Sequence, residues 1–232
     1  NQLSIGMKLA DNLESGNYQN KLILSFVSNP YTLRAVMTNG PDFNARVGNL
    51  DPNPAYYSGS DSPLTKPSIK AFKRSVIAPA NSVSTINIED PDLSDYEIKA
   101  WYNVADQSVY YYAPVSLTYL NPNSRGMFQW FTKIESLDFT NIDTSEVNKM
   151  HAMFYWMQNL KTINFGNFNT SKVTDMTAMF GCTFNLAELN LSSFDTSNVA
   201  QMSYMFHGTY VQKLDLSSFN TSNVINMYSM FE

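Results

Sequence analysis

The chain has 232 residues, of which 44% are hydrophobic and only 15% are charged, and its net charge is −5. It holds no run of Lys and Arg, so its charge pattern argues against a nucleic-acid-binding surface. Its single cysteine cannot form an internal disulfide, and its longest apolar run, residues 21–27, is far shorter than the roughly 20 residues of a membrane span.

The first region, residues 1–65, combines weak signals for regular elements with a long loop. Apolar residues at helical spacing over residues 3–13 predict a helix. Residues 21–27 predict a strand that ends at Asn29-Pro30. Residues 51–67 are rich in Pro, Ser and Gly, a composition typical of a surface loop. We therefore expect an α+β region that closes with this loop.

The second region, residues 66–114, is predicted to hold a helix and a hairpin. Residues 68–75 predict a short helix that carries Ile69 and Phe72. Alternating residues over 96–103, a turn over 104–107 and a second strand over 108–113 predict a β-hairpin. Because a stack of repeats needs its first apolar edge covered, we interpret residues 1–114 as a small capping region.

The third region, residues 115–232, repeats one pattern. A degenerate first copy begins near Val115, and four regular copies follow from Ile134. A Thr-Ser pair and a Met-x-x-Met-Phe signature recur in the regular copies with steps of 26, 26 and 25 residues, which is typical of stacked repeats. These motifs begin at Thr144, Thr170, Thr196 and Thr221, and at Met150, Met176, Met202 and Met227.

Each copy is predicted to be a short strand followed by a short helix. In the third copy, Leu189 and Leu191 alternate with Asn190, so the leucines share one face of a strand. Thr196 is the predicted helix cap. Apolar residues then recur at offsets of three, six and seven, which is one helical stripe. This stripe consists of Val199, Met202, Met205 and Phe206.

The run Leu-Asp-Leu-Ser-Ser-Phe-Asn-Thr-Ser-Asn-Val over residues 214–224 resembles the repeat of BspA-like bacterial surface proteins, a variant of the leucine-rich repeat. The resemblance covers residues 134–232 and implies an α/β fold. That fold is a leucine-rich-repeat-type solenoid, with a parallel sheet and short helices, after the small α+β capping region. It also implies non-enzymatic adhesion outside the cell or at the bacterial cell surface. The implied partners are a host matrix or mucosal protein, a glycan, or another microbial surface; no cofactor is expected.

The open face of the predicted sheet is the candidate ligand-binding surface. Each strand should project one polar side chain from this face, flanked by a second polar row. The candidate residues are Asp138, Asn164, Asn190 and Asp215, flanked by Thr162, Glu188 and Lys213. A sheet face that is merely solvated is an equal alternative.

Other polar and aromatic groups each have a structural interpretation beside a functional one. A cluster of aromatic residues could stack on sugars or close the cap. Acidic residues between 89 and 95 could hold Ca²⁺, although their spacing does not match an EF-hand. His151 and His207 lack further ligands at metal spacing, so we interpret them as structural and expect no metal site. The aromatic cluster is Trp101, Tyr110, Tyr111, Tyr112 and Tyr119.

Two other classes of function remain open. A structural stalk or self-associating scaffold would stack end to end through an exposed strand edge near residues 230–232. A glycan-active enzyme is the weakest hypothesis, because the sequence shows no evident carboxylate pair and no nucleophilic triad, and we name no catalytic residue.

Overall fold

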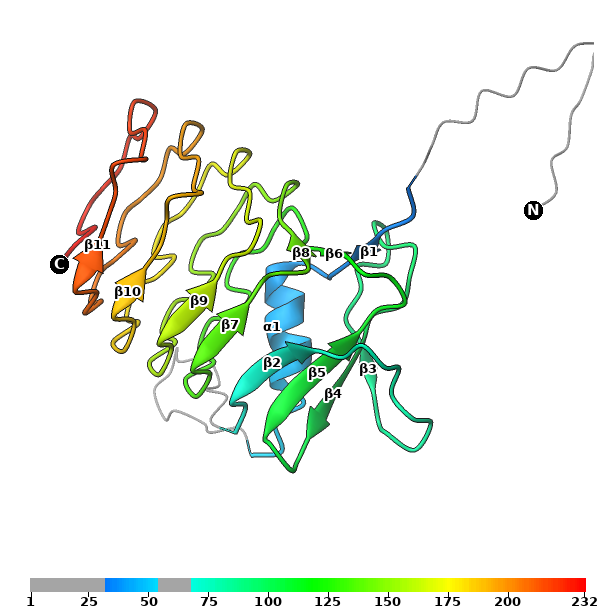
Figure 1. Cartoon of the computed structure of the whole chain (residues 1–232). Coiled ribbons are helices and arrows are strands. Elements are labelled where there is room, and N and C mark those ends of the chain that lie inside the picture. Colours follow the sequence, from blue (N-terminus) through cyan, green and yellow to red (C-terminus); the bar gives the residue numbers. More distant parts are fainter. Residues whose placement is uncertain (1–31, 54–67) are drawn as a thin grey trace, which may run out of the picture. The chain divides into compact units, whose positions relative to one another are not determined.

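A computed structural model describes residues 32–53 and 68–232 (Figure 1). The chain divides into two units, Asn1–Thr32 and Leu33–Glu232, and the second is described below. The helix predicted over residues 3–13, the strand predicted over residues 21–27 and most of the predicted loop fall outside the described residues.

The helix α1, Gly40–Gly48, is the single helix of the described residues, and our sequence analysis did not predict it. It begins where the side chain of Asn39 accepts a hydrogen bond from the backbone N–H of Asp42 at 3.2 Å, with Pro41 in the first turn. Its buried face carries Phe43 and Val47. The start of α1 lies very close to the backbone of Arg125, which precedes the regular copies. A Cβ added at Gly40 would lie only 2.1 Å from the carbonyl oxygen of Arg125.

A mixed sheet in the order β2-β5-β4-β3 forms most of the region before the repeats. The predicted hairpin is confirmed, since β4 (Lys99–Asn103) pairs antiparallel with β5 (Ser108–Tyr112). The short helix predicted over residues 68–75 is wrong. This segment forms β2 (Ala71–Arg74), which pairs parallel with β5, and β3 (Ile86–Asn87) completes the sheet beside β4. Phe72 is buried from β2, and Ile69 is buried just before this strand, because pairing with β5 decides the conformation of the segment.

A parallel sheet in the order β1-β6-β8 connects the leading region to the first regular copy. Its strands are β1 (Ala35–Val36), β6 (Thr118–Tyr119) and β8 (Ile142–Asp143). Thr118 pairs with both Ala35 and Ile142, so residues far apart in the sequence share one sheet.

The regular copies stack in parallel register. Strand β7 (Ser136–Asp138) pairs with β9 (Thr162–Asn164), and β10 (Glu188–Leu189) pairs with β11 (Lys213–Leu214). These four strands lie side by side and point the same way (Figure 1). Isolated parallel bridges join each copy to the next just before the Met-x-x-Met-Phe segments. The bridged residues are Asn123, Lys149, Asp175, Gln201 and Asn226.

The predicted fold class is nevertheless wrong. We expected an α/β leucine-rich-repeat-type solenoid with one parallel sheet and short helices. The structure instead has small separate sheets, both parallel and antiparallel, and its described residues hold no helix within the copies. The α+β interpretation of the cap also missed that its sheet mixes parallel and antiparallel pairing.

The Met-x-x-Met-Phe segments are extended ribbons with turns, which explains the error. In the first copy the N–H groups of Met150, Ala152 and Phe154 donate to carbonyls of the next copy at 2.8–3.0 Å. A helix would direct these N–H groups to its own carbonyls four residues back. Two positions in each of the first three regular copies have positive φ, which a right-handed helix does not allow, such as Ala152 at 54° and Trp156 at 61°. Successive turns thus bury the same residues as the predicted helical stripe.

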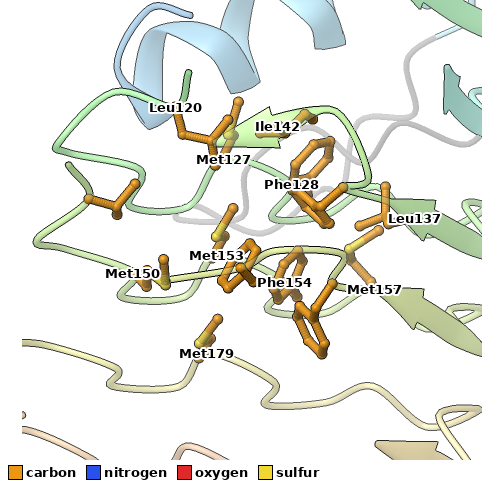
Figure 2. Packing of buried hydrophobic residues seen from close by; sticks show 14 of the residues in the cluster. Leu120, Met127, Phe128, Leu137, Ile142, Met150, Met153, Phe154, Met157 and Met179 are labelled. Carbon is orange, nitrogen blue, oxygen red and sulfur yellow. The ribbon is translucent and has the colours of Figure 1, made fainter. Parts of the chain in front are cut away.

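The core of the copies is a set of side-chain stacks. The rings of Phe128, Phe154, Phe180, Phe206 and Phe231 stack in sequence, with centroids 5.5–6.2 Å apart. Figure 2 shows Phe128 and Phe154 together with Met127, Met153 and Met179, which follow one another from copy to copy. Since equivalent residues pack on each other, each copy buries its apolar side chains against its neighbours.

The threonine of the Thr-Ser pair joins neighbouring copies and caps no helix. The hydroxyl of Thr170 donates to the carbonyl of Asp195 at 2.8 Å and accepts from the N–H of the same residue at 2.8 Å. Thr144 bonds Asn169 in the same way. Thr196 does so with Asn220, at 3.0 and 2.8 Å, so its predicted role as a cap is wrong. Buried hydroxyls therefore connect the backbones of successive copies.

Candidate functional site

All seven candidate residues of the strand face are exposed. The register places Asp138 opposite Asn164 and Glu188 opposite Lys213. Asn190 and Asp215 directly follow β10 and β11. The buried Leu189 and Leu191 lie on either side of Asn190, as the alternation predicts.

The central polar row of this face holds turns. The side-chain oxygen of each residue accepts a hydrogen bond from the backbone N–H two residues later, which is an Asx turn. The donors are Thr140 for Asp138, Gly166 for Asn164, Ser192 for Asn190 and Ser217 for Asp215, at 2.9–3.1 Å. The recurrence of Asp and Asn in this row therefore has a structural cause, and the sequence analysis missed it.

The first two residues of the row also bond each other. The amide of Asn164 donates to a carboxylate oxygen of Asp138 at 3.0 Å and to the hydroxyl of Thr140 at 3.1 Å. At the other end of the row, hydrogen bonds from Ser217 lower the pKa of the Asp215 carboxyl, which stays ionised at neutral pH. The flanking row of Thr162, Glu188 and Lys213 takes no part in these turns.

A shallow hollow of about 220 Å³ lies on this face between β10 and β11. It contains four of the seven candidate residues and brings charges of both signs together. Its lining consists of Glu188, Leu189, Asn190, Lys213 and Asp215.

The aromatic cluster of the cap separates into a buried and a surface part. Tyr111 is buried and stacks on Phe72 with centroids 4.9 Å apart. Trp101 and Tyr110 form a stacked pair across β4 and β5 at 5.9 Å. The hydroxyl of Tyr110 donates to Asp106 at 2.8 Å, and Lys73 pairs with the same carboxylate at 2.9 Å. Tyr111 thus contributes to the packing of the cap, whereas the Trp101–Tyr110 pair is partly exposed.

The acidic residues between 89 and 95 accept hydrogen bonds from protein groups. Asp90 accepts from Asn121 at 2.7 Å and from the N–H of Leu93 at 3.0 Å, and Glu89 accepts from the N–H of Ile98 at 2.9 Å. Within residues 32–53 and 68–232, no group of three His, Cys, Asp or Glu side chains is arranged to hold a metal ion. In the same part of the chain, no helix has the length and hydrophobicity of a membrane span.

A larger pocket of about 410 Å³ lies on the side of the copies formed by the Met-x-x-Met-Phe ribbons. We name it the turn-face pocket, and the sequence analysis did not predict it. It extends across several copies and combines two tyrosines with small and uncharged polar residues. Its lining consists of Gln129, His151, Ala152, Tyr155, Thr177, Ala178, Tyr204 and His207.

The turn-face pocket exists where the copies differ from one another. Gln129, Tyr155, Gly181 and His207 occupy equivalent positions, 26 residues apart, and Gly181 contributes no side chain. The ring of Tyr155 fills this space, since a Cβ added at Gly181 would lie 3.0 Å from the Cδ2 atom of Tyr155. Ala152, Ala178 and Tyr204 also occupy equivalent positions of successive copies, so two small side chains are followed by a large one. Aligning the copies by position would have revealed both departures.

Two interactions fix the electrostatics of the turn-face pocket. Burial lowers the pKa of His151, whose Nδ1 atom lies 3.8 Å from a carboxylate oxygen of Asp175, so this imidazole is neutral at pH 7. Tyr155 shares a hydrogen bond with the Cys182 thiol, and burial raises the pKa of both groups, so both are protonated. The lining is therefore polar in part, and neither His151 nor Tyr155 adds a charge.

The parallel register of the copies and their shared hydrogen bonds define residues 123–232 as tandem strand-and-turn repeats. Residues 123–232 match a sequence family described as Mycoplasma protein of unknown function, DUF285. Comparison with curated proteins and with solved structures finds no match.

Proposed function

We propose that this chain is a non-enzymatic ligand-binding module of a BspA-like bacterial surface protein and acts by adhesion, outside the cell or at the cell surface. Its partner would be a host matrix or mucosal protein, a glycan, or the surface of another microbe. The observation that carries the proposal is the register of exposed polar side chains along the strand face. The family that residues 123–232 match has no described function, so the proposal rests on the strand face and on the resemblance of the repeat sequence.

The strand face suits a large ligand. Its candidate residues are exposed and lie on short paired strands or directly after them, so the backbone sets their positions before a ligand binds. Preorganised side chains lose little conformational entropy on binding. The flanking residues Thr162, Glu188 and Lys213 are the more available ones, because the central row is engaged in Asx turns.

Binding to an array of matrix proteins and glycans tests this proposal. The double variant Thr162→Lys/Glu188→Gln should reduce capture by about tenfold or more, as the loss of an important interface contact does. Its melting temperature should stay unchanged because neither side chain holds a turn. Variants of Asn164, Asn190 or Asp215 are unsuitable, since they would also remove a turn.

The matched control is Asn167→Lys/Ser193→Lys. Both residues are exposed and equivalent to each other, and they lie beyond the Asx turns of the same two copies. This variant also raises the net charge by two, so it should capture ligand like the wild type. Equal capture by all three proteins would exclude the strand face as the binding surface.

A self-associating scaffold is the second candidate function. Ile225 is 78% exposed and Phe231 is 64% exposed, although the ring of Phe231 stacks on Phe206 at 5.6 Å. Exposed apolar side chains of this size favour association with another chain. Sedimentation over a range of concentrations should show oligomers that Ile225→Lys/Phe231→Lys dissociates, and a monomer at every concentration would contradict this candidate.

A further inference from the structure

We propose that the turn-face pocket is a binding site for an uncharged saccharide. Tyr155 and Tyr204 would contact the apolar face of a sugar ring, and the polar lining would bond its hydroxyls. The inference rests on the proposed ligand-binding function, but it places a ligand on a different side of the copies from the strand face. The two sites can therefore be tested separately.

The aromatic walls of the pocket are held in place before any ligand binds. The ring of Tyr155 packs over Gly181 and meets Trp130 edge to face, with centroids 6.0 Å apart. Tyr204 meets His207 at 5.5 Å and Tyr228 at 5.3 Å, both edge to face. Rigid aromatic side chains offer a large contact area at a low entropic cost, which favours binding of a ligand with a flat apolar face.

The polar lining matches hydroxyl groups. The amide of Gln129 and the hydroxyl of Thr177 can each donate and accept a hydrogen bond, and the neutral imidazole of His151 can do the same through its two nitrogens. A sugar hydroxyl likewise donates and accepts. The lining contains no Asp, Glu, Lys or Arg side chain, so the chemistry favours an uncharged ligand.

The dimensions of the pocket fit a small ligand. Its volume of about 410 Å³ lies within the range of roughly 300–1,000 Å³ that is typical of small-molecule sites. The small side chains of Ala152 and Ala178 form part of the lining, together with Tyr155 and Tyr204. At these two positions a ligand has no large side chain to displace.

Saturation-transfer NMR on the full chain tests the inference, with lactose, N-acetyllactosamine, diacetylchitobiose and maltose as probes. Ligand-observed NMR detects weak binding, with a Kd of about 1 mM. Tyr204→Ala should weaken binding about tenfold or more, and Ala178→Tyr should abolish it by filling the pocket. Both variants should fold, because Ala and Tyr already occupy these equivalent positions with φ of 53° and 58°.

Tyr210→Ala is the matched control. Tyr210 is an exposed tyrosine just after the same ribbon and does not line the pocket, so its removal should leave saccharide binding unchanged. Thr162→Lys/Glu188→Gln should also retain saccharide binding if the strand face is a separate site.

Three results would overturn the inference. The first is that none of the four saccharides receives saturation from the protein. The second is that they receive it equally from the wild type and from Ala178→Tyr. The third is that a proline-rich peptide, added as a competing ligand, binds more tightly at Tyr204 and displaces the saccharides. None of these results affects capture of a matrix protein by the strand face, so the proposed function can survive the failure of this site.

Discussion

Replacing Thr170 with Val tests whether buried hydroxyls hold the copies together. Thr170 is 1% exposed, and its hydroxyl satisfies both the N–H and the carbonyl of Asp195, each at 2.8 Å. Valine has nearly the same shape, so the change leaves no cavity. It leaves two backbone groups without a partner, at a cost of about 1–3 kcal/mol each when buried.

We expect Thr170→Val to lower the free energy of unfolding by about 2–4 kcal/mol, a large part of the roughly 5–15 kcal/mol that stabilises a typical domain. Urea denaturation followed by tryptophan fluorescence measures this loss. Thr170→Ser keeps the hydroxyl and removes one methyl group, at a cost of about 1 kcal/mol.

Hydrophobicity alone predicts that Thr170→Val is more stable than Thr170→Ser, because Val is more apolar than Ser. The reasoning is therefore refuted if Thr170→Val is more stable than Thr170→Ser. Thr174→Val serves as the surface control. The hydroxyl of Thr174 donates to the carbonyl of Asn148 at 3.3 Å, but the residue is exposed and water can replace this bond, so stability should change by no more than about 0.5 kcal/mol.

Three further predictions concern backbone geometry and pH. Gly40→Ala should destabilise the protein by about 3 kcal/mol in urea denaturation, because its Cβ would lie 2.1 Å from the carbonyl oxygen of Arg125; a stability equal to wild type would contradict the close approach of α1. Ala152→Gly should raise the free energy of unfolding by about 0.5 kcal/mol, since Ala152 has φ of 54° and glycine relieves left-handed strain of about 1–2 kcal/mol. Ala45→Gly in α1 should instead lower the free energy of unfolding by about 1 kcal/mol. A lower free energy of unfolding in both variants would argue against strain at Ala152. Finally, hydrogen bonds from Ser197 lower the pKa of Asp195, so its carboxylate stabilises the fold above its ordinary pKa of about 4, and this contribution is lost as pH falls through the lowered pKa. Asp195→Asn should weaken the acid dependence of the melting temperature and keep the turn that Asn169 and Asn220 hold in the equivalent copies; an unchanged pH profile would show that Asp195 contributes nothing to it.

The sequence predicts those parts of the fold that depend on local pattern. Alternation over residues 96–113 predicts the hairpin because its two strands are neighbours and joined by a short turn. The inward leucines and the outward Asn190 follow from the same alternation. The signal for α1 was also present, in Asn39 followed by Pro41 and Asp42, which is a helix start that we did not use.

Other parts depend on contacts that no local pattern shows. Residues 71–74 form a strand because β5 pairs with them. The offsets of three, six and seven in the Met-x-x-Met-Phe segments fit successive turns as well as a helix. Gly126 and Gly208 have positive φ of 60° and 64°. Ala152 is equivalent to Gly126, and Trp156 is equivalent to Gly208, and both also have positive φ. The sequence of a single copy does not reveal these left-handed positions.

The candidate site shows the same division. Exposure of the strand face could be predicted from period two alone, whereas the Asx turns required attention to the residue two positions after each Asp or Asn. The turn-face pocket was missed because we read the copies for what they share. It depends instead on Gly181 and Ala178, where one copy departs from the next.

The threonine hydroxyl bonds have a consequence for how such a chain can change in length. Because the junctions between regular copies use an equivalent threonine hydroxyl and equivalent backbone atoms, deleting or duplicating a whole regular copy would keep this pair of bonds at the remaining junctions. Evolution can thus alter the number of copies in single genetic steps without redesigning an interface. A feature built from an irregularity, such as the glycine under Tyr155, has no such freedom: it occurs once, and losing that copy loses it.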